Sequence, residues 1–290
     1  MAPPARPPPK HETASTTTTA LLTWHLLTST EAAPLPCPWE ETMKYRIVAF
    51  DLDDTLAVTK SPVADSMAKL LSALLDQTEV CVISGGQVTQ FTKQVVERLP
   101  EGADLSRLHL MPTCGSRYLR WSTDAGWADV YFDRLTTDER DAAIAALEEG
   151  LEVLGLASPQ TWGPVIEDRG GQVTLSALGQ QAPAEEKYRW DPTGEKKETL
   201  RAYAQDRLPQ LEVRSGGSTS VDITRRGIDK AYGMRRLMEL TGVSLEDVLF
   251  IGDRLDVGGN DRPVLDMGIE CRAVHGPADT EAVICELLSQ

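Results

Sequence analysis

The ten residues from Ile47 to Leu56 constrain the fold more than any other part of the chain. An apolar run typical of a buried strand ends abruptly in Asp51-Leu52-Asp53 and is followed by Thr55. Side chains at i and i+2 of a strand point to the same side, so the two carboxylates are predicted to converge where the strand ends. Two anions held together need a cation, and Mg²⁺, which prefers oxygen ligands, suits them. One carboxylate is then free to act as a nucleophile and the other to transfer a proton. The plainer interpretation, a buried strand capped by a solvated acidic turn, would be preferred for a bare Asp-x-Asp but is disfavoured by this context.

Two further apolar runs also end in polar residues. Glu79–Ile83 leads into Ser84-Gly85-Gly86, and Val248–Ile251 leads into Gly252-Asp253, with Asn260-Asp261 a few residues later. Glycine lets backbone N–H groups approach an anion closely, although strand-Ser-Gly-Gly alone is also an ordinary turn. Because strands and helices alternate here, we expect a mainly parallel sheet flanked by helices. Ligands bind such sheets beyond the carboxyl ends of the strands, where all three polar segments are predicted to lie.

Apolar periodicity predicts the remaining elements. In the first half it indicates helices over 62–75 and 87–99, a strand over 108–111, and a hairpin formed by 117–121 and 127–132. Between about residues 134 and 223 the pattern changes. There it indicates helices over 137–154 and 194–208, and strands over 164–166, 172–178, 211–213 and 218–223. The middle of the chain is therefore expected to form a separate α/β unit.

Composition excludes one class of partner. The formal net charge is −15, with 44 Asp and Glu against 29 Lys and Arg, and such a chain repels nucleic acid. Hydrophobic residues make up 41% and charged residues 25%, as in an ordinary globular protein. The five cysteines are odd in number and lack CxxC spacing, which favours free thiols in a reducing cytosol.

Residues 1–42 have a different composition, rich in Pro and Thr, that does not favour packing. Their apolar stretch at 20–27 is too short and too interrupted to span a membrane. A transit or signal peptide remains open, but the order of charged and apolar residues fits neither well. We expect the natural chain to start at Met43, because Met-Lys-Tyr-Arg leads directly into the first predicted strand.

The ordered motifs resemble those of the haloacid dehalogenase superfamily. Asp51-Leu52-Asp53-Asp54-Thr55 resembles its first motif, Ser84 its second, Lys230 its third, and Gly252-Asp253 with Asn260-Asp261 its fourth. A lone Lys is usually a solvated surface group, so Lys230 gains meaning only from its place in this order. Four motifs in the right order, three of them after apolar runs, rarely arise by chance.

A closer resemblance, from Met43 onward, is to the eukaryotic-type phosphomannomutases of subfamily IIB. It rests on Gly258-Gly259-Asn260-Asp261, on Gly216-Gly217-Ser218-Thr219-Ser220-Val221-Asp222, on Ile166-Glu167-Asp168-Arg169-Gly170-Gly171, and on the C-terminal run 277–288. The resemblance implies a core formed by 43–133 and 224–290, with an α/β cap domain inserted at 134–223. It also implies a cytoplasmic enzyme of GDP-mannose biosynthesis that acts on a sugar phosphate, without a nucleic-acid or membrane partner, and that pairs as a homodimer through the cap.

The resemblance further implies a role for each matched residue. Asp51 would be the nucleophile and Asp53 the general acid and base, with Ser84 and Lys230 offsetting phosphoryl charge. The substrate would be bound by Gly85, Gly86, Arg169, Gln180, Lys187, Ser220 and Asp222. The cofactor would be Mg²⁺, with ligands or supporting residues among Asp51, Asp53 (through its backbone carbonyl), Asp253, Asn260 and Asp261. Mannose 1-phosphate and mannose 6-phosphate would be interconverted through an aspartyl-phosphate and a hexose bisphosphate.

Three departures from the family pattern bear on the activity. Gln180 and Lys187 stand where the family has arginines for the remote phosphate, and neither offers the bidentate guanidinium fork. Asp54 replaces the usual glycine. A weakened remote clamp keeps open an alternative, a sugar-phosphate phosphatase, in which water accepts the phosphoryl group. A silent sugar-phosphate sensor is disfavoured, because Asp51, Asp53, Lys230 and Asp253 are all present.

Overall fold

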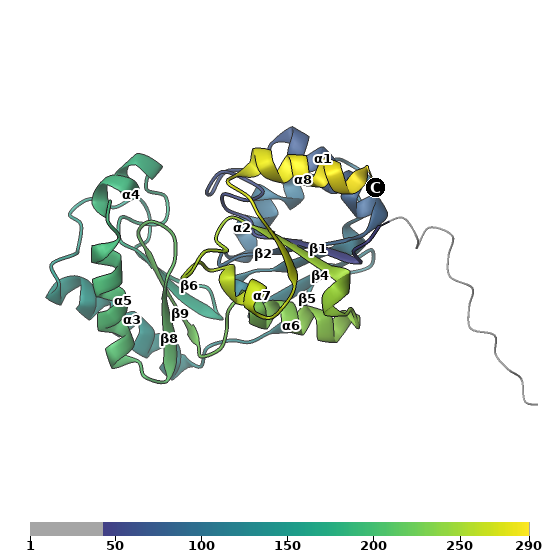
Figure 1. Cartoon of the computed structure of the whole chain (residues 1–290). Helices are drawn as coiled ribbons and strands as arrows, with labels where there is room; N and C mark the ends of the chain where they lie inside the picture. Colours follow the sequence, from purple (N-terminus) through teal and green to yellow (C-terminus); the bar gives the residue numbers. More distant parts are fainter. Residues whose placement is uncertain (1–42, 290) are drawn as a thin grey trace, which may run out of the picture. The chain divides into compact units, whose positions relative to one another are not determined.

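The computed structural model describes residues 43–289, and the predictions made for residues 1–42 lie outside this range. Its larger sheet has seven strands in the order β11-β10-β1-β2-β3-β4-β5. The first five are mutually parallel, and β4 and β5 are antiparallel to their neighbours. Figure 1 labels β1, β2, β4 and β5 of this sheet. The strands are β1 (Ile47–Phe50), β2 (Glu79–Ile83), β3 (Leu108–Met111), β4 (Arg117–Ser122), β5 (Gly126–Phe132), β10 (Val248–Gly252) and β11 (Glu270–Ala273).

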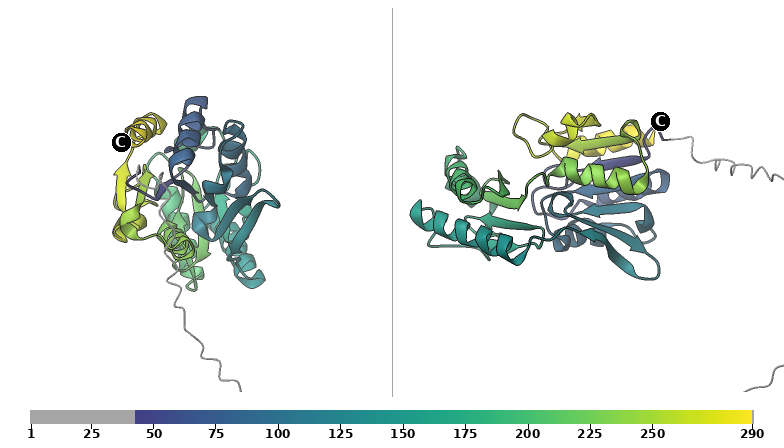
Figure 2. Two further views of the ribbon diagram at one scale, coloured as in Figure 1. Left: turned by 90° about the vertical axis from the view of Figure 1, so that its right-hand side faces the viewer. Right: turned by 90° about the horizontal axis from the view of Figure 1, so that it is seen from below.

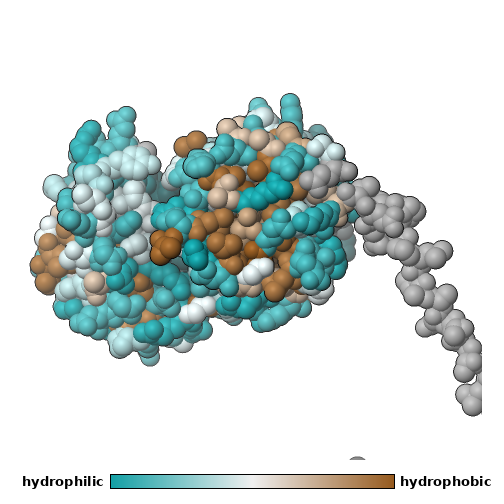
Figure 3. Space-filling model, in the orientation of Figure 1, coloured by the Kyte–Doolittle hydropathy of each residue, from teal (hydrophilic) through white to brown (hydrophobic). Residues whose placement is uncertain are grey.

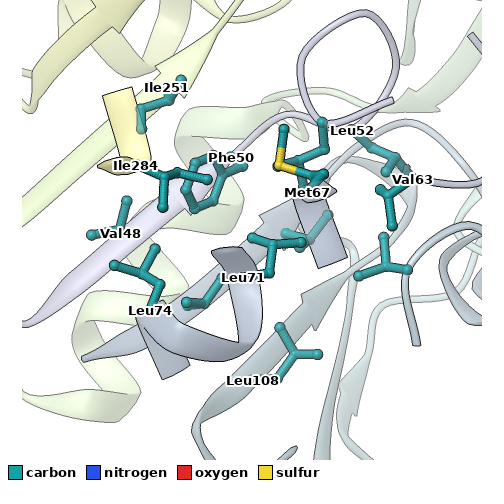
Figure 4. Packing of buried hydrophobic residues seen from close by; sticks show 14 of the residues in the cluster. Val48, Phe50, Leu52, Val63, Met67, Leu71, Leu74, Leu108, Ile251 and Ile284 are labelled. Carbon is teal, nitrogen blue, oxygen red and sulfur yellow. The ribbon is translucent and has the colours of Figure 1, made fainter. Parts of the chain in front are cut away.

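Helices cover both faces of this sheet (Figure 2). One face packs against α1 (Asp65–Gln77), α2 (Val88–Gln94) and α8 (Pro277–Leu288). Figure 4 shows the centre of this layer, where Phe50 of β1 lies among Leu71 of α1 and Ile284 of α8. The other face packs against α6 (Lys230–Thr241) and α7 (Arg262–Asp266). Because both faces are buried, β1 and β10 are apolar throughout rather than alternating.

The smaller sheet is antiparallel, with the order β6-β7-β9-β8. Its strands are β6 (Ile166–Asp168), β7 (Gln172–Ser176), β8 (Leu211–Ser215) and β9 (Ser220–Arg225). The helices of this unit, which we call the cap, are α3 (Thr137–Val153), α4 (Ala184–Trp190) and α5 (Glu195–Arg207). A capping box between Thr136 and Glu139 satisfies the first amides of α3 and fixes where it begins.

Side chains alternate along β7 and β9 between an apolar face that packs against helices and a polar face that lines a cleft. Val173, Leu175, Val221 and Ile223 are buried in one cluster with residues of α3 and α5. The alternate residues of these strands point to the opposite face, which lines a cleft: Gln172, Thr174, Ser220, Asp222 and Thr224. The period of two therefore gives the cap one apolar face for its own helices and one polar face for a ligand.

The predicted α/β fold class is confirmed, with a mainly parallel core sheet and a separate antiparallel insert. Some boundaries differ. The helix expected over 87–99 ends at Gln94 and continues as a 3₁₀ turn, η1 (Val96–Arg98), and the strand expected over 164–166 lies at Ile166–Asp168. The short elements α4, α7 and β11 were not predicted, nor were the 3₁₀ turns η2 (Leu105–Arg107), η3 (Thr113–Gly115) and η4 (Leu245–Asp247). Within residues 43–289, no helix is long and apolar enough to cross a membrane.

The first turn of α6 is packed against η3 without intervening side chains. A Cβ added to Gly115 would lie 2.3 Å from the Cα of Gly233, and the φ of Gly115 is +81°. We expect Gly115→Ala to lower the free energy of unfolding by about 2 kcal/mol or more, since it adds overpacking to backbone strain. Urea denaturation measures the loss. Gly102→Ala is the matched control, because Gly102 has a φ of +91° but no atom within 4 Å of the added Cβ. An equal loss in both variants would contradict the close packing.

Candidate active site

Three neighbouring parallel strands deliver polar residues to one edge of the core sheet. Asp51 follows β1, Ser84 follows β2 and Asp253 follows β10, and β1 lies between the other two strands. Asp51 and Ser84 are buried, while Asp253 is partly exposed and accepts a hydrogen bond of 3.2 Å from Thr55 Oγ1. The three segments that the sequence placed at strand ends are thus brought together.

A buried charge cluster lies at this edge. Lys230, the first residue of α6, places its Nζ 2.5 Å from Asp51 Oδ1 and 2.5 Å from Asp261 Oδ1. Lys230 and Asp261 are almost completely buried. Asp261 is also held by the backbone N–H of Arg254, which donates to its Oδ2 at 3.0 Å. The sequence placed Lys230 here only through the order of motifs, and the fold brings it into direct contact with both carboxylates.

Burial and mutual repulsion shift the pKa values in this cluster. Burial raises the pKa of Asp51 well above its usual value, and the nearby Asp261 adds to the rise while Lys230 opposes it. Burial, followed by the charge of Asp261, also raises the pKa of Asp253. Burial alone would lower the pKa of Lys230, but Asp261 and Asp51 raise it above its ordinary value. Lys230 therefore stays positively charged. Its single charge is not enough to stabilise the ionised form of all the nearby carboxylates.

The acidic cluster could hold a metal ion. Asp51, Asp253 and Asp261 each offer a carboxylate oxygen, and these atoms lie within 4.8 Å of one another. Three carboxylates beside one lysine carry two uncompensated negative charges, which one divalent cation would balance. A purely oxygen donor set suits Mg²⁺ better than a softer transition metal. Asn260 lies on the wall of the cleft.

Asp53 occupies a separate position beside the cluster. Its Oδ1 accepts the backbone N–H of Lys60 at 2.8 Å and is 3.4 Å from Gln94 Nε2. Its Oδ2 accepts from Gln90 Nε2 at 2.9 Å. The side chain is thus oriented by α2 and by the loop after β1, which leaves it pointing at the cleft without a contact to Lys230. Gln90 and Gln94 were not singled out from the sequence.

The cleft between core and cap has a volume of about 640 Å³. Figure 3 shows the surface notch between the part that contains α4 and the part that contains α8. Eight basic side chains line the cleft: Lys60, Arg169, Lys187, Lys197, Arg201, Arg214, Lys230 and Arg254. Seven acidic side chains also line it: Asp51, Asp53, Asp54, Glu198, Asp222, Asp229 and Asp253. The lining is therefore close to neutral although the whole chain carries −15, so the cleft is the place where an anion is least repelled.

A basic group gathers where the cap meets the loop after β1. Lys60 Nζ donates to the backbone carbonyl of Gln180 at 2.9 Å and lies 3.3 Å from its Oε1. Arg169 donates to the carbonyl of Gly85 at 2.7 Å and pairs with Glu167 at 2.9 Å. Lys187 of α4 is buried beside Lys60. In the described part of the chain, neither lysine has a carboxylate within salt-bridge distance.

The two lysines shift each other's pKa. Lys60 is exposed as a residue, but its ammonium group lies among protein atoms, and burial followed by the charge of Lys187 lowers its pKa to about 8. Burial lowers the pKa of Lys187 as well. Asp53 is the nearby negative charge, but within residues 43–289 it makes no salt bridge to either lysine, so the two adjacent ammonium groups are a favourable place for an anion. Lys60 was missed from the sequence, where it is one more charged residue in a loop.

The other expected substrate residues also reach the cleft. Gly85, Gly86, Ser220 and Asp222 line it. The carboxylate of Asp222 accepts from Thr174 Oγ1 at 2.7 Å and from Gln172 Nε2 at 2.9 Å, so cap side chains fix its orientation. By contrast, neither Arg225 nor Arg226 replaces the missing cap arginine, because they bond to Glu139 and to the carbonyl of Pro209.

Neither His109 nor His275 lines the cleft. His109 is fully buried between Tyr118 and Glu79, with its ring nitrogens 2.7 and 2.6 Å from their oxygens. The side chain of His275 is 96% exposed at the start of α8. Neither approaches the acidic cluster, which agrees with an oxygen-only site.

The chain is similar in sequence to the eukaryotic phosphomannomutases. A family model described as eukaryotic phosphomannomutase matches residues 151–290. The phosphomannomutase of Saccharomyces cerevisiae is 24% identical over 250 residues, which cover 84% of this chain and 94% of the relative. The part of this chain that matches the family model contains Lys230, Asp253 and Asp261. The alignment with the yeast relative also covers most of the core.

Comparison with solved structures gives the fold. A haloacid dehalogenase-like hydrolase from Bacteroides thetaiotaomicron has a TM-score of 0.58 at 15% identity and covers 84% of this chain and 99% of its own. An N-terminally truncated IMP-nucleotidase from Plasmodium falciparum has a TM-score of 0.63 at 15% identity, with coverages of 86% and 71%. At such identities the likeness shows a shared architecture and no more.

Proposed function

We propose that this chain, which has a haloacid dehalogenase-like fold and is similar to the eukaryotic phosphomannomutases, interconverts mannose 1-phosphate and mannose 6-phosphate. The reaction would proceed by Mg²⁺-dependent phosphoryl transfer through Asp51. One observation carries the proposal: the cleft has two cationic positions. Lys230 forms an ion pair with Asp51, and the Lys60–Lys187 pair lies near Gln180, where no carboxylate of residues 43–289 is within salt-bridge distance of either lysine.

A mutase has to bind a phosphate at each end of its sugar, because the phosphoryl group leaves one hydroxyl and returns to the other. Loss of the family arginine at Gln180 weakens the remote position. The Lys60–Lys187 pair supplies the missing charge there, and Gln180 accepts hydrogen bonds from Lys60 and Arg169 through Oε1. A lysine ammonium binds phosphate as a point charge, whereas an arginine guanidinium can donate two parallel hydrogen bonds. The lysine pair should therefore attract the remote phosphate without fixing its orientation.

The chemistry assigned to each residue follows from its environment. Asp51 attacks phosphorus in line, and Lys230 and Ser84 offset the charge on the transferring oxygens. Asp53, oriented by Gln90, donates a proton to the leaving sugar oxygen and takes one from the next acceptor. A divalent ion held by Asp51, Asp253 and Asp261, with the backbone carbonyl of Asp53, would supply Lewis-acid stabilisation of the phosphoryl oxygens. Ser220 and Asp222 would contact sugar hydroxyls.

The test measures isomer formation and phosphate release in the same reaction. Purified protein is incubated with mannose 1-phosphate, MgCl₂ and a catalytic amount of a hexose 1,6-bisphosphate. We expect mannose 6-phosphate to form in large excess over inorganic phosphate. Release of inorganic phosphate alone would contradict the mutase proposal and indicate that water is the acceptor. Glucose 1-phosphate in a parallel reaction tests the choice of sugar.

The Lys60–Lys187 pair predicts a pH dependence. The pKa of Lys60 is lowered to about 8, so its positive charge is present at pH 7 and is lost as the pH rises through 8. We expect the KM for mannose 1-phosphate to rise several-fold between pH 7 and 9, while kcat changes less. In Lys60→Met the KM should be high already at pH 7 and nearly independent of pH. The same rise in wild type and variant would exclude Lys60 as its origin.

A further inference from the structure

Both connections between core and cap are attached to the first turn of α6. The chain leaves the core after β5 at Asp133, whose Oδ2 accepts from Tyr232 Oη at 2.5 Å. It returns after β9 to Asp229, the N-cap of α6, whose Oδ1 accepts the N–H of Tyr232 at 2.8 Å. Lys230 lies in the same turn. A single helical turn thus holds the outgoing connection, the returning connection and the buried lysine.

This turn is fixed on its core side. Gly233 packs directly against Gly115, and the aromatic ring of Tyr131 lies between core and helix, with the guanidinium of Arg236 4.7 Å from the ring centre. Tyr131 Oη also donates to the carbonyl of Gly115 at 2.7 Å. Core packing therefore fixes the far side of the turn, so movement of the N-cap changes where the side chain of Lys230 points.

One cap side chain reaches the N-cap from β8. Arg214 Nη1 donates to the carbonyl of Ile228 at 2.6 Å, and its Nη2 lies 3.1 Å from Glu212 and 3.6 Å from Asp229 Oδ2. Its partners are thus the two residues that immediately precede Lys230, together with one neighbour on its own strand. The sequence offered no sign of this contact, because Arg214 is an ordinary alternating residue of an antiparallel strand.

We propose that Arg214 is a positioning residue that couples the cap to the placement of Lys230 between Asp51 and Asp261. It holds Ile228 and Asp229 in register with the cap sheet, so Lys230 is correctly placed only when the cap is in place. The expected effect of Arg214 on the reaction rate rests on the proposed phosphoryl transfer. The expected effect of Arg214 on the position of Lys230 does not. Arg214 also lines the cleft, so a direct contact to substrate is the competing role.

The kinetic test uses two substrates with Arg214→Met. A hexose phosphate offers the cap a sugar to contact, whereas p-nitrophenyl phosphate presents a phosphoryl group without one. If Arg214 acts through Lys230, kcat should fall about tenfold or more for both substrates, with the hexose phosphate KM nearly unchanged. If Arg214 binds the sugar phosphate directly, only the hexose phosphate KM should rise, and this result would overturn the proposal. Added guanidinium should restore part of the lost kcat.

The structural test does not depend on activity. Lys230 is 1% exposed, and acylation by an amine reagent under native conditions should spare it in wild type. Arg214→Met should increase acylation of Lys230 several-fold, as measured by peptide mass spectrometry, without a matching change at Lys187. Arg226→Met is the control, since exposed Arg226 lies in the same connection and its guanidinium donates to the carbonyl of Pro209. Unchanged Lys230 acylation in Arg214→Met would contradict the inference. Wild-type protein without turnover of any phosphate ester would contradict only the proposed function.

Discussion

Asp51→Asn is expected to reduce turnover of hexose phosphates by about ten thousandfold or more, because the amide cannot form an acyl phosphate. The substitution keeps the size and the buried position of the side chain. It removes one of the two carboxylates that contact Lys230, and Asp261 still pairs with that lysine. The protein should therefore remain folded, so that the loss of rate reports chemistry.

The measurement combines rate with detection of the intermediate. Wild-type protein incubated briefly with labelled hexose bisphosphate should retain label that hydroxylamine releases, as an acyl phosphate does, and Asp51→Asn should retain none. Asp76→Asn, at an exposed position of α1, is the matched control. Mass spectrometry must show that the asparagine has not deamidated. A variant as fast as the parent would refute the nucleophile assignment, as would a wild-type rate that a metal chelator leaves unchanged.

Lys230→Met is expected to have the largest combined effect on activity and stability. It leaves Asp51 and Asp261 buried without their cation, and loss of one partner from a buried ion pair costs about 3–5 kcal/mol. Turnover should fall by about a thousandfold, because a preorganised charge beside the transferring oxygens is lost. Lys69→Met, on the exposed face of α1, should change neither quantity appreciably.

Metal and pH should modulate the instability of Lys230→Met in a defined direction. Urea unfolding in chelator should show the full loss, and MgCl₂ should recover part of it, because the cation replaces positive charge. In the variant, Asp51 lacks the positive charge that opposes the effect of burial, so its pKa, which burial already raises, rises further above the unfolded value. The folded state then binds more protons, and its stability is retained at low pH and lost as the pH rises. A loss of stability independent of both MgCl₂ and pH would contradict the charge-cluster interpretation.

The edge of the core sheet that carries the acidic cluster was largely predictable from local sequence. Apolar runs ending in Asp51, Ser84 and Asp253 specified both the strands and the residues that follow them. In a parallel sheet the carboxyl ends of neighbouring strands meet at one edge, so correct strands sufficed to bring these side chains together. The alternation in β7 and β9 likewise placed Ser220 and Asp222 on the polar face of the cap.

Prediction was poorest where function depends on contacts between distant segments. Lys60 and Lys187 are 127 positions apart in the printed chain, one in a loop and one on a short helix that periodicity did not indicate. Gln90 orients Asp53 from α2, and Arg214 reaches Ile228 from a cap strand. Nothing in the local pattern distinguishes these side chains from solvated ones.

The sequence by itself determined the strand-terminal carboxylates, their order with Lys230, and the division between an apolar core and a polar cleft. These features are local, since backbone periodicity and burial of apolar side chains dictate them over a few residues. Only the tertiary structure decided which cations of the described chain face the cleft without a salt-bridge partner and how the cap connects to α6. Those properties depend on which charges lie within a few ångströms across the fold, because a charge is neutralised by its neighbours in space and not by those in sequence.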